Sequence, residues 1–126
     1  MTSQGAGRPF GINEKIEAHR ACQLSGSVYI APSKNEDEVL TGISDEDEAI
    51  FRYVEWETPA KEILIEASGS GEIYIYLDDE KHASGSITLE EGQIVVSSFQ
   101  GPSGKHQIKL QFNKIKKLEI HALYFR

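Results

Sequence analysis

Residues 104–125 read GKHQIKLQFNKIKKLEIHALYF, which is two runs of alternating apolar and polar side chains separated by a short polar break. The apolar positions are Ile108, Leu110 and Phe112 in the first run and Leu118, Ile120 and Ala122 in the second. Side chains on a β-strand point alternately to opposite faces, so each run predicts a strand with one face on a core and one face in solvent. The stretch therefore predicts two adjoining strands of a β-protein.

The rest of the sequence predicts many short strands and no helix of convincing length. The candidate strands are residues 15–20, 27–30, 50–56, 62–67, 72–77, 86–89 and 93–97. Residues 68–71 (SGSG) predict a loop, and residues 45–53 could hold at most one helical turn. Short strands at regular spacing, with Gly, Ser and Asp between them, favour an all-β fold: a jelly-roll β-sandwich of two antiparallel sheets.

The sequence divides into a short head and one domain. Residues 1–12 are rich in Gly, Ser and Thr and lack the apolar stretch of a signal peptide, so we expect a flexible head, a linker or an expression remnant. Residues 13–126 are expected to form one β-sandwich domain that buries a core without disulfides. The single cysteine, Cys22, leaves no internal disulfide and no thiolate metal cluster.

The net charge of −7 narrows the classes of partner. Proteins that bind nucleic acid need Lys and Arg to neutralise phosphates, so this balance argues against nucleic acid and against anionic membrane surfaces. No apolar run approaches the roughly 20 residues of a membrane-spanning helix. Neutral ligands remain open because they require no charge balance.

Carboxylates and histidines form no recognisable catalytic or metal-binding motif. Two acidic segments, residues 35–38 and 45–48, are candidates for acid–base chemistry or calcium. An EF-hand calcium loop requires Gly at its sixth position, where Ile50 stands after Asp45, so we favour a solvated loop. None of the four histidines has the spacing of a zinc helix. The hypothesis that the chain is an independent hydrolase is therefore supported only by scattered carboxylates.

Aromatic side chains are the remaining candidates for a ligand-binding site. Sugar-binding sites stack the apolar face of a pyranose on Trp or Tyr, while amides and carboxylates bind the hydroxyl groups. The aromatic candidates are Tyr29, Tyr74, Tyr76, Phe99 and Trp56. Tyr74 and Tyr76 share a strand face opposite Ile73 and Ile75, so we expect them to be half exposed. The competing interpretation is that these rings cover the second face of the sandwich.

Four fragments, taken in order, carry a family resemblance. They are KIEAH at residues 15–19, AIFRYVEW at 49–56, GKHQIKLQF at 104–112 and LEIHALYF at 118–125. Together they resemble carbohydrate-binding module family 6 from about residue 13 onward. The lead-in GINEKIEA at residues 11–18 is similar to the junction at which such a module follows a family 43 glycoside hydrolase domain.

The resemblance implies a jelly-roll sandwich without catalytic activity of its own. Its expected task is to hold a glycoside hydrolase on xylan, arabinoxylan or β-glucan. The implied partners are therefore a polysaccharide and a catalytic domain in the same polypeptide, in a secreted or cell-envelope protein. The alternative is a structural accessory domain that packs against the catalytic domain and binds no glycan.

The resemblance also locates the family's main sugar cleft, which uses a Tyr, a Trp and an Asn. The matching positions are Ile43 or Ser44, Ile94 or Val95, and Glu119, so both aromatic platforms and the amide are replaced and the cleft is expected to be degenerate. The residues that we then expect to contact sugar, on exposed sheet faces and at loop ends, are Tyr74, Tyr76, Trp56, Ser44, Gln93 and Glu119.

The family's structural calcium site uses carboxylates on the first and last strands. Glu17 matches one of them, whereas His19 and His121 stand where further carboxylates are common. Imidazole is a poor ligand for a hard cation, so we expect no cofactor, or a structural calcium ion at these positions. Because the first and last strands pair in this fold, His19 and His121 are expected to be neighbours that pack, hydrogen-bond or bind a softer metal.

Overall fold

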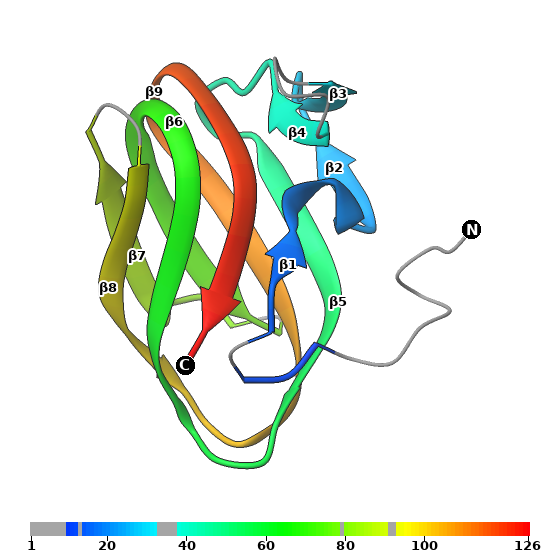
Figure 1. The fold of residues 1–126 in the computed structure, drawn as a ribbon, viewed down its shortest axis with the longest axis vertical. Coiled ribbons are helices and arrows are strands. Elements are labelled where there is room, and N and C mark those ends of the chain that lie inside the picture. Colours follow the sequence, from blue (N-terminus) through cyan, green and yellow to red (C-terminus); the bar gives the residue numbers. More distant parts are fainter. Residues whose placement is uncertain (1–9, 13, 33–37, 79, 91–92) are drawn as a thin grey trace.

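A computed structural model describes residues 10–12, 14–32, 38–78, 80–90 and 93–126, and most of this chain is extended (Figure 1). The strands are β1 (Ile16–Glu17), β2 (Gln23–Ser25), β3 (Tyr29–Pro32), β4 (Glu38–Thr41), β5 (Glu48–Trp56), β6 (Ala60–Leu77), β7 (Gly85–Leu89), β8 (Gln93–Gly101) and β9 (Gly104–Phe125), with a 3₁₀ helix η2 (Ala18–Arg20) after β1. All pairings between these strands are antiparallel. No helix in the described ranges is long and apolar enough to cross a membrane.

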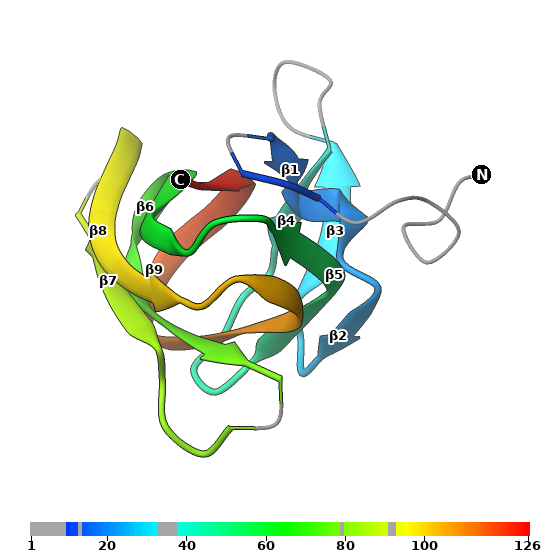
Figure 2. The same cartoon turned by 90° about the horizontal axis from the view of Figure 1, so that it is seen from below.

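Two long strands, β6 and β9, run through both layers of the molecule (Figures 1 and 2). Residues 60–67 of β6 pair with β8 on one side and with residues 120–125 of β9 on the other. We call this the β8 layer, which β1, β4 and β3 extend. Residues 71–77 of β6 pair with β7 and with the first half of β9, forming the β7 layer, which β5 and β2 extend. The predicted antiparallel sandwich is confirmed, and its two layers are continuous through β6 and β9.

The inner faces of the two layers share one core, as the alternation predicts. In β6, Ile63, Ile65, Ile73 and Ile75 are fully buried between partly exposed neighbours. In β9, every apolar position of the two alternating runs is buried, and the polar positions between them are partly exposed. Each large apolar side chain contributes roughly 1.5–3 kcal/mol by leaving water. A core of this kind stabilises the sandwich without disulfides.

The long strands change layer at two corners that touch each other. The corner of β6 is at Gly69, with a φ of 94°, and that of β9 includes Lys114 and Lys117, with φ of 53° and 52°. A Cβ atom on Gly69 would lie 2.1 Å from the carbonyl oxygen of Lys117, so only glycine fits there. The loop predicted for residues 68–71 is therefore wrong. The strand continues through this segment because its glycines absorb the bend.

Other local predictions differ from the structure in detail. The strand predicted for residues 15–20 is only β1, after which η2 turns the chain while Ala18 stays buried. Residues 45–53 form a short turn and the start of β5 rather than a helical turn, since their apolar side chains repeat with a period of two. β2 and β4 escape prediction because they are only three and four residues long.

The folded unit includes residues that the sequence assigns to the head. Phe10 is 5% exposed and belongs to the core. Its backbone N–H donates to Tyr53 O at 3.0 Å, and its carbonyl accepts the N–H of Glu55 at 2.9 Å. The predicted boundary at residue 13 is therefore too late, because Phe10 fills the core beside β5.

Replacing Gly69 with Ala should lower the free energy of unfolding by about 2 kcal/mol or more, because the new Cβ meets the Lys117 carbonyl in a backbone conformation that L-residues rarely adopt. Gly11→Ala is the matched control, since a Cβ there meets only Glu14 Oε1 at 3.7 Å and Glu55 O at 3.9 Å. Urea unfolding followed by circular dichroism measures both variants. Equal stability of the two would contradict the contact between the corners.

Candidate functional site

Trp56 lies in the core. Its side chain is 1% exposed and packs edge-on against Phe99, with ring centroids 5.9 Å apart, and obliquely against Phe125 at 5.1 Å. A register shift in β5 between Arg52 and Val54 keeps Trp56 on the inner face. The prediction that Trp56 offers a sugar platform on an exposed sheet face is therefore wrong. Phe99, at 3% exposure, is a core residue as well.

Tyr74 and Tyr76 point outward from the β7 layer and are partly exposed, as predicted. Tyr74 stands opposite Gln111 of β9, and Tyr76 stands opposite Lys109. β5 continues the first row, because Glu48 stands opposite Gln111. The two tyrosines therefore belong to rows of side chains that run across neighbouring strands.

Polar contacts join these side chains into one surface, which we call the tyrosine face (Tyr74, Tyr76, Lys109, Gln111 and Glu48). Tyr76 Oη donates to Gln111 Oε1, and Gln111 Nε2 donates to Glu48 Oε2, each over a long 3.5 Å. Lys109 Nζ lies 3.7 Å from Glu48 Oε2 and 5.0 Å from the centroid of the Tyr76 ring. The face thus combines aromatic rings, an amide and a pair of opposite charges.

Glu72 fixes the edge of the tyrosine face. Tyr74 Oη donates to Glu72 Oε1 at 3.2 Å, and this hydrogen bond together with the negative charge of Glu72 raises the pKa of Tyr74 above its ordinary 10.0. Lys114 Nζ lies 3.8 Å from the other oxygen of the same carboxylate. The Tyr74 hydroxyl therefore stays protonated at neutral pH and serves as a donor.

Ser44 and Glu119, two predicted loop-end residues, lie close to the same loop after β4. Ser44 Oγ is 2.9 Å from Ser27 Oγ, which donates to the carbonyl of Gly42 at 2.6 Å. Glu119 Oε2 accepts a hydrogen bond from Thr41 Oγ1 at 3.1 Å. Because Thr41 and Gly42 are consecutive, the loop brings Ser44 and Glu119 to one end of the sandwich.

Asp47 holds this loop in place. It is 6% exposed, and its Oδ2 accepts hydrogen bonds from the backbone N–H groups of Ser44 at 2.9 Å and Ser27 at 3.1 Å. The same oxygen lies 3.0 Å from Ser27 Oγ. Gln93, the third predicted loop-end residue, starts β8 opposite Ala67, and its side chain lies outside the described part of the chain. The structure therefore brings two of the three residues together and gives only a backbone position for the third.

Tyr29 provides an exposed ring beside these loop-end residues. Its side chain is 55% exposed, and it stands opposite Thr41 at the edge of the β8 layer. A Cβ on Gly42 would lie 2.4 Å from Tyr29 Cε1, so the ring rests directly on glycine backbone. The sequence names Tyr29 only as one of several aromatic candidates, because its contact with Gly42 forms only once β3 and β4 pair. Ile43, which with Ser44 is one of the two positions expected to match a cleft aromatic of the family, is buried.

No protein-family model matches this sequence, and no curated protein matches it. Among solved structures, a β-1,3-glucan-binding family 6 module from Bacillus halodurans matches with a TM-score of 0.85 at 17% identity, over 94% of this chain and 99% of that one. A family 43 arabinoxylan arabinofuranohydrolase from Bacillus subtilis matches with a TM-score of 0.80 at 15% identity, over 94% of this chain and 28% of that one. The fold is that of a family 6 carbohydrate-binding module.

A more distant match contains calcium. It is a family 36 carbohydrate-binding module in complex with calcium and xylotriose, with a TM-score of 0.67 at 14% identity, over 89% of this chain and 98% of that one. In the present chain β1 pairs with β9, as predicted for the first and last strands. Among the residues that the structure describes, no three His, Cys, Asp or Glu side chains gather in a way that could hold a metal ion.

The described members of the predicted calcium set are one carboxylate and one imidazole. Glu17 Oε1 lies 3.9 Å from Arg20 Nη1, so its charge is already partly balanced. His121 offers a nitrogen donor, whereas Ca²⁺ takes six to eight oxygen ligands. The side chain of His19 lies outside the described part of the chain, and its contact with His121 stays a prediction.

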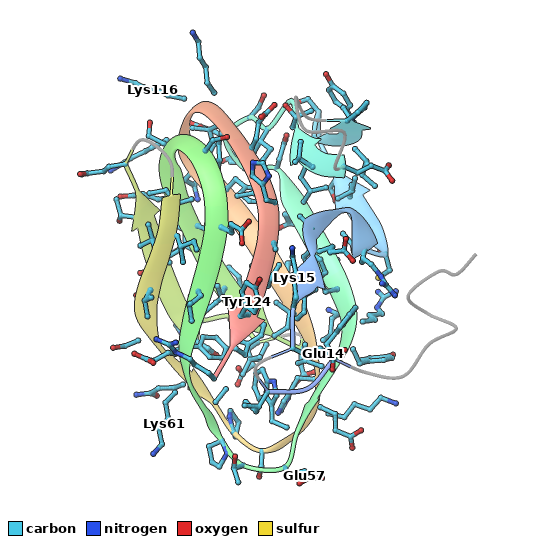
Figure 3. All side chains as sticks on the ribbon, in the orientation of Figure 1. Glu14, Lys15, Glu57, Lys61, Lys116 and Tyr124 are labelled. Atoms are coloured by element: carbon cyan, nitrogen blue, oxygen red, sulfur yellow. The ribbon has the colours of Figure 1, made fainter. Side chains whose placement is uncertain are left out.

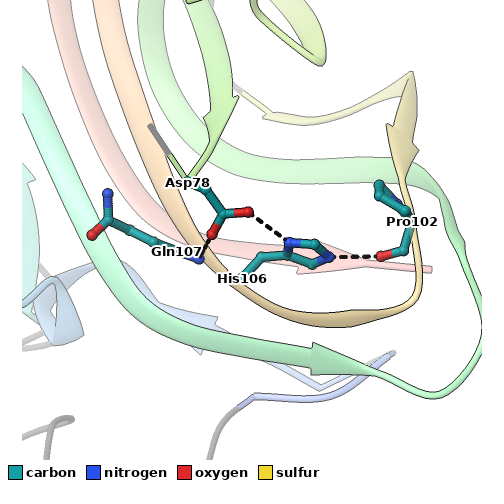
Figure 4. Close-up of polar contacts among 4 residues, drawn as sticks. All are labelled: Asp78, Pro102, His106 and Gln107. Carbon is teal, nitrogen blue, oxygen red and sulfur yellow. Dashed lines mark hydrogen bonds and ion pairs between the residues drawn. The ribbon is translucent and has the colours of Figure 1, made fainter. Parts of the chain in front are cut away.

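A second polar cluster lies where the end of β6 meets the turn between β8 and β9 (Figure 4). His106 Nδ1 is 2.9 Å from Asp78 Oδ2, and His106 Nε2 is 2.8 Å from the carbonyl oxygen of Pro102. Asp78 Oδ1 also accepts the backbone N–H of Gln107 at 3.0 Å. Both ring nitrogens of His106 face acceptors, so the imidazolium form, in which both are donors, satisfies the site. We call Asp78, His106 and Pro102 the His106 clamp.

Opposing effects set the protonation of the clamp. Partial burial favours the neutral ring, but the hydrogen bonds to Asp78 and Pro102 and the charge of Asp78 outweigh it and raise the pKa of His106 above 6.5. Burial likewise opposes ionisation of Asp78, yet the hydrogen bonds from Gln107 and His106 lower its pKa below 3.8. The ring of His106 also packs 5.5 Å from that of Trp56, which connects the clamp to the core.

The His106 clamp should stabilise the fold most at a pH between the ordinary pKa values of its two titratable groups, which are 3.8 for Asp78 and 6.5 for His106. Because the pKa of His106 is raised on folding, its contribution to the free energy of unfolding is complete below pH 6.5. That contribution is lost as the pH rises through the pKa of His106 in the folded protein. Because the pKa of Asp78 is lowered on folding, its contribution to the free energy of unfolding is complete above pH 3.8. That contribution is lost as the pH falls through the pKa of Asp78 in the folded protein.

Urea unfolding at a series of pH values checks this with His106→Gln, which should cost about 0.5–1 kcal/mol near pH 5.5 and less as the pH rises above neutrality. His82→Gln replaces an exposed histidine and is the control, with a small and flat difference expected. A cost of His106→Gln that does not change with pH would show that the pair contributes no charge-dependent stability.

Proposed function

We propose that this chain is a non-catalytic carbohydrate-binding module that recognises a neutral plant polysaccharide such as xylan, arabinoxylan or β-glucan. The observation that carries the proposal is the tyrosine face, where two partly exposed rings lie in register with an amide and a balanced charge pair on an open sheet surface. The fold supports the proposal, because a module of the same fold from Bacillus halodurans binds β-1,3-glucan.

The tyrosine face provides both kinds of contact that a sugar needs. The apolar C–H face of a pyranose packs on tyrosine rings, while hydroxyl groups, which both donate and accept, find a donor in Lys109, an acceptor in Glu48 and both in Gln111. The 3.5 Å hydrogen bonds of Gln111 are weak, so their exchange for bonds to a ligand costs little. Opposite charges on Glu48 and Lys109 cancel, which favours a neutral glycan.

The shape of the tyrosine face favours an extended glycan chain. Outward residues on one strand are about 6.8 Å apart, so Tyr74 and Tyr76 make successive contacts along β6 while their rows cross to β9. An open sheet surface lets a polymer pass in both directions and contacts its internal units. It does not enclose a substrate away from water, which favours binding over catalysis.

The loop end supplies a further contact area in this proposal. Tyr29 exposes its ring close to Ser44 and Glu119, which offer a hydroxyl and a carboxylate. In this proposal the Tyr29 ring takes the place of the family's first aromatic platform, whose position is held here by Ile43 or Ser44. Gln93, at the start of β8, stays a predicted sugar contact.

The proposal includes a glycoside hydrolase domain as a partner in the same polypeptide. The family 43 enzyme from Bacillus subtilis supports this, because the part that matches this chain is 28% of that enzyme's length. We also propose that the fold does not depend on calcium, since the described residues of the predicted set are a carboxylate near an arginine and an imidazole.

Replacing both Tyr74 and Tyr76 with Ala should weaken binding to the preferred polysaccharide by about tenfold or more, because buried aromatic contacts usually dominate such interfaces. Affinity electrophoresis on xylan, arabinoxylan and β-glucan measures the retardation of each variant. Tyr124→Ala is the matched control, because Tyr124 is a partly exposed tyrosine of β9 on the outer surface of the other layer.

Two outcomes of that electrophoresis have different meanings. Unchanged retardation of the double variant on a polysaccharide that retards the wild type would remove the tyrosine face from the proposal. Free migration of the wild type on all three polysaccharides would overturn the proposed function itself.

An exposed apolar patch favours the structural alternative as a second candidate function. Ile94 and Val96 of β8 are 57% and 44% exposed, and Leu64 stands between Val96 and Tyr124 in the ladder. A shallow cavity of about 180 Å³ is lined by Leu64, Ile94, Tyr124 and Arg126. Figure 3 shows Tyr124 beside the strand end of β9. Exposed apolar clusters of this kind mark protein contacts, so we infer that this patch packs against a catalytic domain.

In a polypeptide that joins this module to a family 43 catalytic domain, Ile94→Thr with Val96→Thr should uncouple the unfolding of the two domains. The hydroxyl groups reduce apolar contact while the strand keeps its β-branched side chains. Differential scanning calorimetry should show one shared transition for the wild type and two for the variant. Identical transitions in both proteins would contradict docking through this patch.

A further inference from the structure

A pocket of about 660 Å³ opens at the end of the sandwich away from Tyr29 and Glu119. Its walls come from the start of β6, from the end of β6 with the loop that leads to β7, and from the end of β8 with the turn that follows it. Figure 2 views the molecule from this end, and Figure 3 shows Lys61, which lines the pocket, opposite the β9 corner where Lys116 lies. The volume falls within the roughly 300–1,000 Å³ of small-molecule sites.

Part of the pocket lining is apolar. Leu77 and Phe99, which belong to the core, form part of the lining, and Pro59 and Pro102 add rigid apolar surface at the rim. Ala83 lines the pocket from the loop between β6 and β7 and is exposed. Burial of an apolar face of the ligand against this lining therefore stabilises binding.

The polar groups around the pocket include both donors and acceptors. Lys61 and Glu80 contribute opposite charges, and Gln100 contributes an amide that donates and accepts. His82 and Ser84 add further hydrogen-bonding groups. The formal charges of Lys61 and Glu80 cancel, so the pocket favours a neutral ligand that has many hydroxyl groups and one apolar face.

The His106 clamp connects two walls of the pocket. Asp78 directly follows Leu77, and the carbonyl of Pro102, another lining residue, accepts the second hydrogen bond of His106 at 2.8 Å. The clamp therefore fixes the distance between the end of β6 and the turn after β8 (Figure 4). Walls held by the fold lose little freedom when a ligand enters, which favours binding.

We propose that this pocket binds the end of a neutral glycan chain or a short neutral oligosaccharide, as a site separate from the tyrosine face. The inference rests on the proposed carbohydrate-binding function and extends it. The tyrosine face contacts internal units of a polysaccharide along the sheet, whereas the pocket at the end of the sandwich accepts a chain terminus. The two sites therefore differ in the length of glycan that they retain.

Isothermal titration with cellobiose, xylobiose and laminaribiose tests the pocket. Ala83→Trp fills it, and should weaken binding of whichever disaccharide the wild type binds by about tenfold or more. Lys81→Trp is the matched control, because Lys81 is an exposed residue of the same loop and does not line the pocket; its effect should stay below about twofold. Neither variant should change retardation by polysaccharide through the tyrosine face.

The outcomes separate this inference from the proposed function. Unchanged disaccharide affinity in Ala83→Trp, or no disaccharide binding by a wild type that polysaccharide still retards, overturns the pocket and leaves the tyrosine face. No binding of any glycan overturns both. If circular dichroism shows that Ala83→Trp does not fold, His82→Ala with Gln100→Ala removes hydrogen-bonding groups from the pocket and carries the same expectation.

Discussion

β6 and β9 pair antiparallel along most of their lengths, from Ile63 opposite Phe125 to Leu77 opposite Ile108. Both strands bend at the same level, where Gly69 meets the Lys117 carbonyl, so each strand contributes one half to each layer. β7 and β8 pair with β6, and β1, β4 and β5 pair with β9. The two-layer architecture therefore depends on one ladder that satisfies its buried backbone groups while it turns from layer to layer.

The position of each surface follows from this ladder. The half of β6 in the β7 layer turns Tyr74 and Tyr76 outward, and the half in the β8 layer turns Leu64 outward beside Val96. The first surface is polar and aromatic, whereas the second is apolar. A glycan and a protein partner would therefore approach opposite sides of the sandwich. The pocket lies at an end between the layers, where the clamp around His106 joins the closing turns.

Strand alternation predicts most of the fold and two of the five residues of the tyrosine face as sugar contacts. Tyr74 and Tyr76 are predicted because their apolar neighbours alternate with them, and the same pattern places Gln111 and Lys109 on a polar face. Nothing in the sequence showed that these two polar faces are one surface, because antiparallel pairing joins residues far apart in the chain. The prediction for Trp56 is wrong because an aromatic residue at a strand end is equally compatible with the core and with an exposed platform. The register shift in β5 decides between the two.

The sequence by itself determined the strand content, the alternating core positions and the acidic balance of the surface, because these depend on the period of the side chains and on their charges. Only the tertiary structure decided which strands are continuous. At the bend of β6, Gly69 packs against the Lys117 carbonyl of the β9 corner, and this contact joins residues far apart in the sequence. It also decided which polar side chains meet. Tyr29 rests on Gly42, and the walls of the pocket come from three distant segments, so both features exist only after long-range pairing.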